Sequence, residues 1–140
     1  MRPLLHPPKP PATVHLMGIC GTAMGAFAGM LHDLGFTITG SDTGVYPPMS
    51  DYLRGLGIDI MPGFEAHNLD HRPDLVVVGN VVRASYPEAQ ALLASDLPYT
   101  SMPDLFGRMF LAHAHTTVVA GTHGKTTTTA LTAWLLECAG

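Results

Sequence analysis

Short apolar runs alternate along this chain with stretches of helical character. The first run, Thr13 to Met17, leads into a glycine-rich turn, and a helix is predicted from about Ala23 to Leu34, where Gly35 acts as its C-cap. A second strand is predicted over Phe36 to Thr39, and it stops at Gly40-Ser41-Asp42. These elements form one β-α-β unit.

The same alternation continues to about residue 112. The run Leu75 to Val78 has no polar alternation, which is typical of a strand buried on both faces of a parallel sheet. The other predicted elements are helices over 49–56, 87–95 and 103–112 and strands over 58–60 and 98–101. Strands that alternate with helices predict an α/β fold, a doubly wound parallel sheet with right-handed crossovers.

A glycine loop with a lysine lies near the end of the sequence. The apolar run Thr117 to Ala120 predicts a buried strand, a helix-like stretch begins at about Lys125, and the loop between them reads Gly121-Thr122-His123-Gly124-Lys125-Thr126-Thr127. Such a loop turns backbone N–H groups toward one point at a helix N-terminus and so binds polyphosphate. Lys125 would reach the β- and γ-phosphates, and the Thr126 hydroxyl would hold Mg²⁺.

The match to a phosphate-binding loop is imperfect. Val119 stands where the general pattern has its first glycine, so the loop is a shortened variant. His123 is assigned to the cradle through its backbone N–H. The alternative is a glycine-rich turn whose lysine is merely solvated.

The first glycine loop half matches a dinucleotide fingerprint. Gly18 and Gly21 are present and Asp42 ends the next strand, but Cys20 and Ala23 occupy the second and third glycine positions. Three alternatives stay open on this pattern: a nicotinamide or flavin dinucleotide, another nucleotide or nucleotide sugar, and simple tight packing.

Composition excludes several function classes. A charged fraction of 13% and a net charge of −4 argue against a nucleic-acid-binding surface. Two cysteines, Cys20 and Cys138, suit a reducing cytoplasm. No apolar run approaches the roughly 18 residues of a membrane-spanning helix. Residues 1–12 are proline-rich and are predicted to be a disordered leader.

The two loops and several runs between them resemble the N-terminal portion of the Mur ligases, ATP-dependent enzymes of bacterial peptidoglycan assembly. The likeness is carried by His15-Leu16-Met17-Gly18-Ile19-Cys20-Gly21-Thr22, Gly40-Ser41-Asp42, Val45-Tyr46-Pro47-Pro48-Met49-Ser50 and Val78-Gly79-Asn80. It extends over nearly all of Thr13 to Gly140. The alanine-adding branch of the family typically has glycine-rich sequence where Cys20, Thr22 and Ala23 stand, so the chain is more similar to the branch that adds a preformed murein tripeptide.

The resemblance implies a Rossmann-like domain over 13–113 that holds a UDP sugar, followed over 114–140 by the first strand, phosphate loop and helix of a truncated ATP-binding domain. The implied UDP-sugar-binding residues are Gly18, Cys20, Gly21, Thr22, Ala23, Met24, Ser41, Asp42 and Asn80. The implied ATP-binding residues are Gly121 to Thr127, with Lys125 catalytic and Thr126 the metal ligand.

The resemblance also implies a reaction. In the family, ATP phosphorylates the lactyl carboxylate of UDP-N-acetylmuramate, and an amine attacks the acyl phosphate to form an amide. The expected cofactors are ATP and Mg²⁺, and the expected substrates are UDP-N-acetylmuramate and a murein tripeptide, in the bacterial cytoplasm, with no nucleic acid and no membrane insertion. Glu137 is the only carboxylate side chain after Lys125, and it lies late in a helix-like stretch. The sequence therefore offers no acidic residue at a strand end to help hold Mg²⁺, and no domain for the amine substrate. We expect the chain to be a fragment that is inactive alone.

Three other functions stay open at this stage. One is the ligation of UDP-N-acetylmuramate to L-alanine, a second is a non-catalytic nucleotide-binding module, and the third is an NAD-dependent dehydrogenase. A dehydrogenase would use the first glycine loop but would have no use for Gly124-Lys125-Thr126.

Overall fold

The computed structural model describes residues 7–112 and 114–140 and divides the chain into two compact units. The first ends at Phe110, and the second runs from Leu111 to Gly140. Part of the predicted leader, residues 1–6, lies outside the described residues. Residues 7–12 form no helix or strand, yet Ala12 packs against the core and accepts a hydrogen bond from the Thr37 N–H (3.0 Å). The first unit therefore includes the end of that leader.

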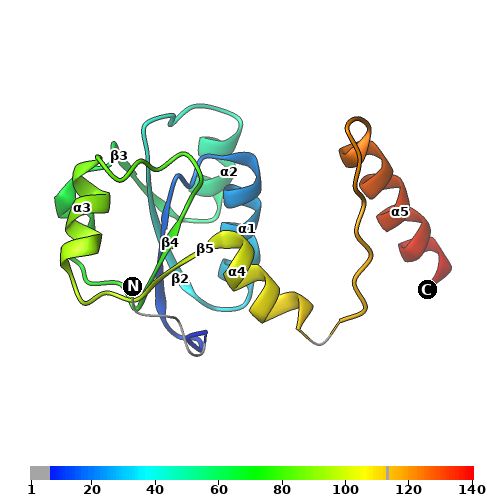
Figure 1. The fold of residues 1–140 in the computed structure, drawn as a ribbon, viewed down its shortest axis with the longest axis horizontal. Helices are drawn as coiled ribbons and strands as arrows, with labels where there is room; N and C mark the ends of the chain where they lie inside the picture. Colours follow the sequence, from blue (N-terminus) through cyan, green and yellow to red (C-terminus); the bar gives the residue numbers. More distant parts are fainter. Residues whose placement is uncertain (1–6, 113) are drawn as a thin grey trace. The chain divides into compact units, whose positions relative to one another are not determined.

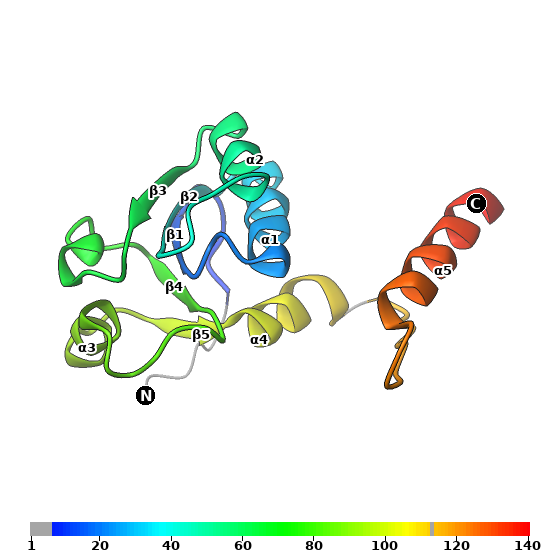
Figure 2. The ribbon, with the colours of Figure 1, turned by 90° about the horizontal axis from the view of Figure 1, so that it is seen from above.

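The first unit, coloured blue to yellow in Figure 1, is built on five parallel strands in the order β3-β2-β1-β4-β5, which Figure 2 labels in turn. The strands are β1 (Thr13–Met17), β2 (Thr37–Asp42), β3 (Asp59–Pro62), β4 (Leu75–Val78) and β5 (Tyr99–Ser101). The predicted doubly wound sheet is confirmed. Its strand order reverses between β1 and β4, and ligands of such sheets bind at the carboxyl ends of the strands beside this reversal.

Helices cover both faces of the sheet. The helices are α1 (Thr22–Asp33), α2 (Met49–Gly55), α3 (Pro87–Ala94) and α4 (Met102–Phe106), with a 3-10 helix η1 (Ala66–Leu69) and a π-helical turn η2 (Gly107–Leu111). Figure 2 shows α1 and α2 on one side of the sheet and α3 on the other. Successive side chains of β1 serve the two faces, because Leu16 joins the core under α1 and α2 while Met17 joins the core under α3.

The contact between α1 and α2 depends on two small residues. A Cβ atom on Gly25 would collide with the sulfur of Met49, and one on Gly29 would collide with the hydroxyl of Tyr52. These glycines allow α2 to lie directly against α1.

The second unit contains one long helix, α5 (Lys125–Ala139). The strand predicted over 117–120 is wrong: these residues form no strand, and Val118 is 79% exposed. A strand is held by hydrogen bonds to a neighbouring strand, and the described part of this unit contains none. The apolar residues of α5 are correspondingly exposed: Leu131, Trp134, Leu135 and Leu136.

Candidate nucleotide-binding site

The first glycine loop leaves the carboxyl end of β1 and is fastened to the end of β2. The N–H groups of Gly18 and Ile19 donate to the carbonyl of Ser41 at 2.7 and 3.2 Å. Gly18 has a φ of +85°, in the left-handed region that favours glycine, and a Cβ there would lie 2.9 Å from a Val81 methyl group. The loop is therefore held in one shape before any ligand arrives.

Asp42 braces this loop. Its Oδ2 accepts a hydrogen bond from the Cys20 N–H (2.9 Å) and its Oδ1 accepts one from the Gly44 N–H (2.8 Å), with 8% of the residue exposed. The carboxylate thus joins the loops that follow β1 and β2. Burial, and then the nearby Asp42 carboxylate, raise the pKa of the Cys20 thiol.

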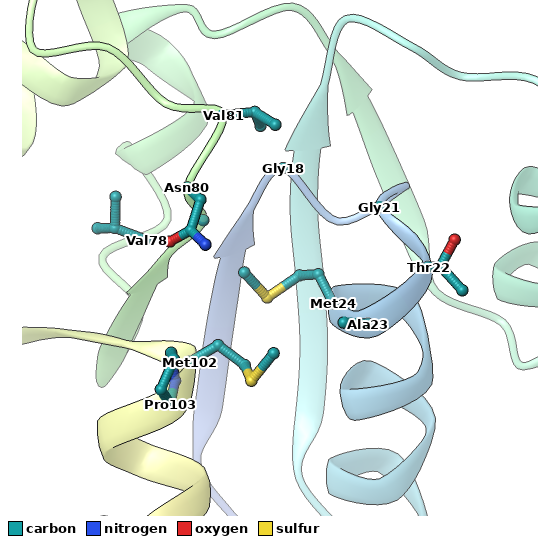
Figure 3. Close-up of a pocket in the computed structure, with 11 residues that line it drawn as sticks. Gly18, Gly21, Thr22, Ala23, Met24, Val78, Asn80, Val81, Met102 and Pro103 are labelled. Carbon is teal, nitrogen blue, oxygen red and sulfur yellow. The ribbon is translucent and has the colours of Figure 1, made fainter. Parts of the chain in front are cut away.

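A pocket of about 240 Å³ lies where the strand order reverses, between the ends of β1 and β4. Figure 3 shows Met24 of α1, Asn80 from the loop after β4, and Met102 of α4 around it, with the Thr22 side chain turned away. The pocket is mainly apolar. With the Thr22 side chain turned away, its polar groups are those of the backbone and of Asn80. It also touches Gly18, Gly21, Ala23, Val78, Gly79, Val81 and Pro103.

The N-terminus of α1 opens beside this pocket. Its N-cap is Gly21, which supplies no side-chain hydrogen bond, and Thr22, Ala23 and Met24 form the first helical turn. The first N–H groups of a helix have no partner within it and carry partial positive charge. This end of α1 is therefore suited to an anionic group such as a pyrophosphate.

A second pocket of about 270 Å³ lies on the other side of the same loop. The rings of Phe64 and Tyr86 form part of its wall and are stacked, with centroids 5.0 Å apart and planes 9° from parallel. Asp42 and Tyr46 also line it. Gly18, Gly21 and Val81 border both pockets, so the two flank one loop.

Most of the predicted UDP-sugar residues come together around these pockets. Gly18, Gly21, Thr22, Ala23, Met24 and Asn80 line the first, and Gly18, Cys20, Gly21 and Asp42 line the second. Ser41 is fully buried: its carbonyl holds the loop, and its Oγ has no hydrogen-bond partner among the described residues. Its contribution to the site is therefore through the backbone.

Sequence reasoning missed the aromatic wall. Phe64 follows β3 and Tyr86 precedes α3, far apart in sequence, and only the crossover connections bring the rings together.

The predicted phosphate loop lies in the second unit. Gly124 has a φ of +75° and forms the N-cap of α5, and its carbonyl accepts a hydrogen bond from the Thr128 N–H (2.9 Å). The Lys125 ammonium donates to the carbonyls of Gly121 (2.8 Å) and Thr122 (3.4 Å). The loop is exposed, and its lysine is satisfied by the loop itself.

Two further findings concern the described residues as a whole. They contain no group of three or more His, Cys, Asp or Glu side chains arranged to hold a metal ion. Among them, no helix has the length and apolar character needed to span a bilayer.

Comparison with known proteins places this geometry in a family. The sequence model described as Mur ligase family, catalytic domain, matches residues 13–114, most of the chain. The chain belongs to the Mur ligase family. The predicted resemblance is confirmed.

Relatives of this Mur ligase chain include two kinds of ligase. It is 43% identical over 127 residues to UDP-N-acetylmuramate--L-alanyl-gamma-D-glutamyl-meso-2,6-diaminoheptandioate ligase of Escherichia coli, covering 91% of the chain but 28% of that protein. It is 38% identical over 126 residues to UDP-N-acetylmuramate--L-alanine ligase of Lachnoclostridium phytofermentans, covering 90% of the chain and 27% of that protein.

The chain also matches a solved structure, that of a murein peptide ligase. The crystal structure of a murein peptide ligase from Psychrobacter arcticus matches 92% of the chain and 27% of its own length, with a TM-score of 0.87 and 45% identity. The Mur ligase chain therefore spans less than a third of the length of these three proteins.

Proposed function

We propose that the chain is the nucleotide-sugar-binding part and the phosphate loop of an ATP-dependent ligase that joins UDP-N-acetylmuramate to a murein tripeptide. The observation that carries the proposal is the pair of pockets around one braced glycine loop, beside the uncapped N-terminus of α1. The names of the more similar relatives, at 43% and 45% identity, favour the tripeptide over L-alanine as the amine substrate.

The two pockets suit different parts of a nucleotide sugar. The pyrophosphate fits at the first turn of α1, where N–H groups and the helix dipole favour an anion. The uracil ring fits the second pocket, where Tyr86 presents a flat aromatic surface stacked on Phe64. Asp42 then acts on binding by holding the loop between the two pockets, because both of its oxygens already accept backbone N–H groups.

The phosphate loop is proposed to bind ATP through residues Gly121 to Thr127. Lys125 would exchange its two carbonyl partners for the β- and γ-phosphates and stabilise charge on the transferred phosphoryl group. Thr126 stands beside Lys125 in the first turn of α5 with an exposed side chain, a position that fits the hydroxyl ligand of Mg²⁺. Phosphate oxygens and water would supply the other ligands, and the ion would offset phosphate charge.

A dehydrogenase fits these residues less well. Cys20 and Ala23 stand where a dinucleotide fingerprint has glycines, and Cys20 uses its backbone N–H to reach Asp42.

Cys20 and Cys138 are both free thiols, in keeping with a reducing, cytoplasmic site of action.

Calorimetric titration tests the proposal. The chain is titrated separately with UDP-N-acetylmuramate, ATP and NAD, and we expect the uridine nucleotide sugar to bind most tightly. Asp42→Ala should weaken that binding by about tenfold, since it frees two backbone N–H groups of the site loops. Asp51→Ala is the matched control, because Asp51 is an exposed carboxylate on α2. Tight NAD binding without uridine binding would revive the dehydrogenase.

A further inference from the structure

A carboxyl group and an imidazole are paired beneath the sheet. Glu88, in the first turn of α3, and His15, in the middle of β1, are both fully buried, and His15 Nε2 lies 2.8 Å from Glu88 Oε1. Neither lines the pockets described above. The proposed reaction gives this pair no role.

The pair belongs to a longer chain of hydrogen bonds. His15 Nδ1 lies 2.9 Å from the Thr39 hydroxyl on β2, and that hydroxyl lies 3.1 Å from His71 Nε2. On the other side, the Asn68 amide donates to Glu88 Oε2 (3.2 Å), and Asn68 is 1% exposed. Two central strands are thus connected to α3 and to the segment before β4.

This network also contacts the backbone of the segments that carry the aromatic wall of the second pocket. The Asn68 amide also donates to the Gly63 carbonyl (3.1 Å), and the Glu88 N–H donates to the Phe64 carbonyl (3.1 Å). Tyr86 is the N-cap of α3, two residues before Glu88. Both segments that carry the stacked rings are therefore attached to Glu88, whose carboxyl group contacts His15 of the sheet.

Hydrogen bonds and apolar contacts fix positions differently. An apolar contact is non-directional, so side chains can shift along it at little cost, whereas a hydrogen bond weakens steeply once its angle falls below about 120°. In a buried site an unpaired polar group is costly, so the members of such a network hold one another in one arrangement. Attachment through Glu88 therefore fixes where the two rings meet.

We propose that Glu88, His15 and Asn68 are positioning residues for nucleotide binding, which hold the Phe64–Tyr86 ring stack as the wall of the second pocket. The proposal rests on the proposed function, because it assigns that wall to the uracil ring. The three side chains act through the rings and do not touch the nucleotide.

Two substitutions of His15 separate its two contacts. The amide of His15→Gln falls near the place of Nε2 and keeps the contact with Glu88, whereas that of His15→Asn falls near Nδ1 and keeps only the contact with Thr39. Both remove the imidazole ring. His67→Asn is the control, because His67 is an exposed histidine of η1.

A second pair of variants tests Glu88 without removing its volume. Glu88→Gln keeps the shape but turns one acceptor into a donor, which opposes the Asn68 amide or, when turned toward His15, requires the tautomer whose Nε2 accepts. Glu65→Gln makes the same chemical change at an exposed position one residue after Phe64. If a His15 variant does not fold, the test rests on Glu88→Gln and its control, and if Glu88→Gln does not fold, it rests on the two His15 variants.

Each variant is measured in two ways. Stacked rings shield one another, so the NMR chemical shifts of the Tyr86 and Phe64 ring protons report the stack with no ligand present. Calorimetry then gives the affinities for UDP and for inorganic pyrophosphate. In His15→Asn and Glu88→Gln we expect smaller ring shifts and UDP affinity about tenfold lower, the scale of one lost stacking contact, with pyrophosphate affinity changed less than about twofold. His15→Gln should restore most of both signals.

Three outcomes contradict parts of this inference. Unchanged ring shifts in the folded variants would overturn the positioning role. Displaced rings with unchanged UDP affinity would overturn its link to binding. A wild-type chain that binds no UDP would instead overturn the proposed function, while the ring shifts still decide whether the network holds the stack.

Discussion

The two glycine loops share a local pattern but differ in what surrounds them. In the first, the Gly18 and Cys20 N–H groups are held by Ser41 and Asp42, residues that arrive from another strand. In the second, the Lys125 ammonium bonds to carbonyls of its own loop, and every residue from 120 to 130 is exposed.

The difference shows how a binding loop acquires its shape. The first loop is shaped by residues that are distant in sequence. Its conformational entropy is therefore lost when the chain folds, and a ligand that binds there need not order the loop. The second satisfies its lysine internally, so a phosphate bound there would have to replace existing hydrogen bonds. Equal sequence signals therefore correspond to unequal degrees of preorganisation.

The largest test of this contrast is the lysine. In a ligase that contains both units, Lys125→Ala should lower the rate of amide formation by about 10²–10³-fold, the scale of losing one charge-stabilising donor from an active site. Affinity for the uridine nucleotide sugar, measured by calorimetry, should stay unchanged because the site proposed for it lies in the other unit. A variant with near-normal turnover would remove the phosphate-loop assignment.

A matched pair of glycine substitutions compares the loops directly. Gly18 and Gly124 both have left-handed φ values, +85° and +75°, but a Cβ meets Val81 at 2.9 Å in the first and nothing within 4 Å in the second. Gly18→Ala should lower the free energy of unfolding of the first unit by about 2 kcal/mol, through left-handed strain. Gly124→Ala should leave that value unchanged in chemical denaturation and affect only hydrogen exchange in α5. Equal losses in the sheet would contradict the contrast.

The two thiols provide a milder comparison. Because burial and Asp42 raise the pKa of Cys20, little of it is thiolate at neutral pH, whereas Cys138 is exposed on α5. Iodoacetamide should therefore label Cys138 about tenfold faster, as followed by mass spectrometry of peptides. Faster labelling at Cys20 would show that the first loop opens readily.

The smallest expected effect concerns pH. Burial, and then the nearby His15, lower the pKa of His71 from its ordinary 6.5, so the unfolded chain binds more protons than the folded one below that pH. The stability from neutral His71 is present above about pH 6.5 and is lost as the pH falls below it. His71→Asn should flatten the pH dependence of thermal unfolding, whereas His123→Asn, in the second loop, should not.

Local patterns predicted the sheet but not all of the site. The runs that became β1, β2, β4 and α1 were identified because apolar periodicity reports burial directly. The strand predicted over 117–120 is wrong because pairing depends on a neighbour that the run itself does not encode. Asp42 was placed correctly at the end of β2, but the sequence could not show that backbone N–H groups take both of its oxygens.

Gly25 and Gly29 of α1 set the position of α2, and so affect the second pocket although neither lines it. Met49, which lies against Gly25, begins α2 directly after the loop that carries Tyr46 to that pocket. A larger side chain at Gly25 or Gly29 would push α2 outward and take Tyr46 with it. The width of the second pocket therefore depends on a contact between two helices, and a substitution at Gly25 or Gly29 would change it without altering any residue that lines the pocket.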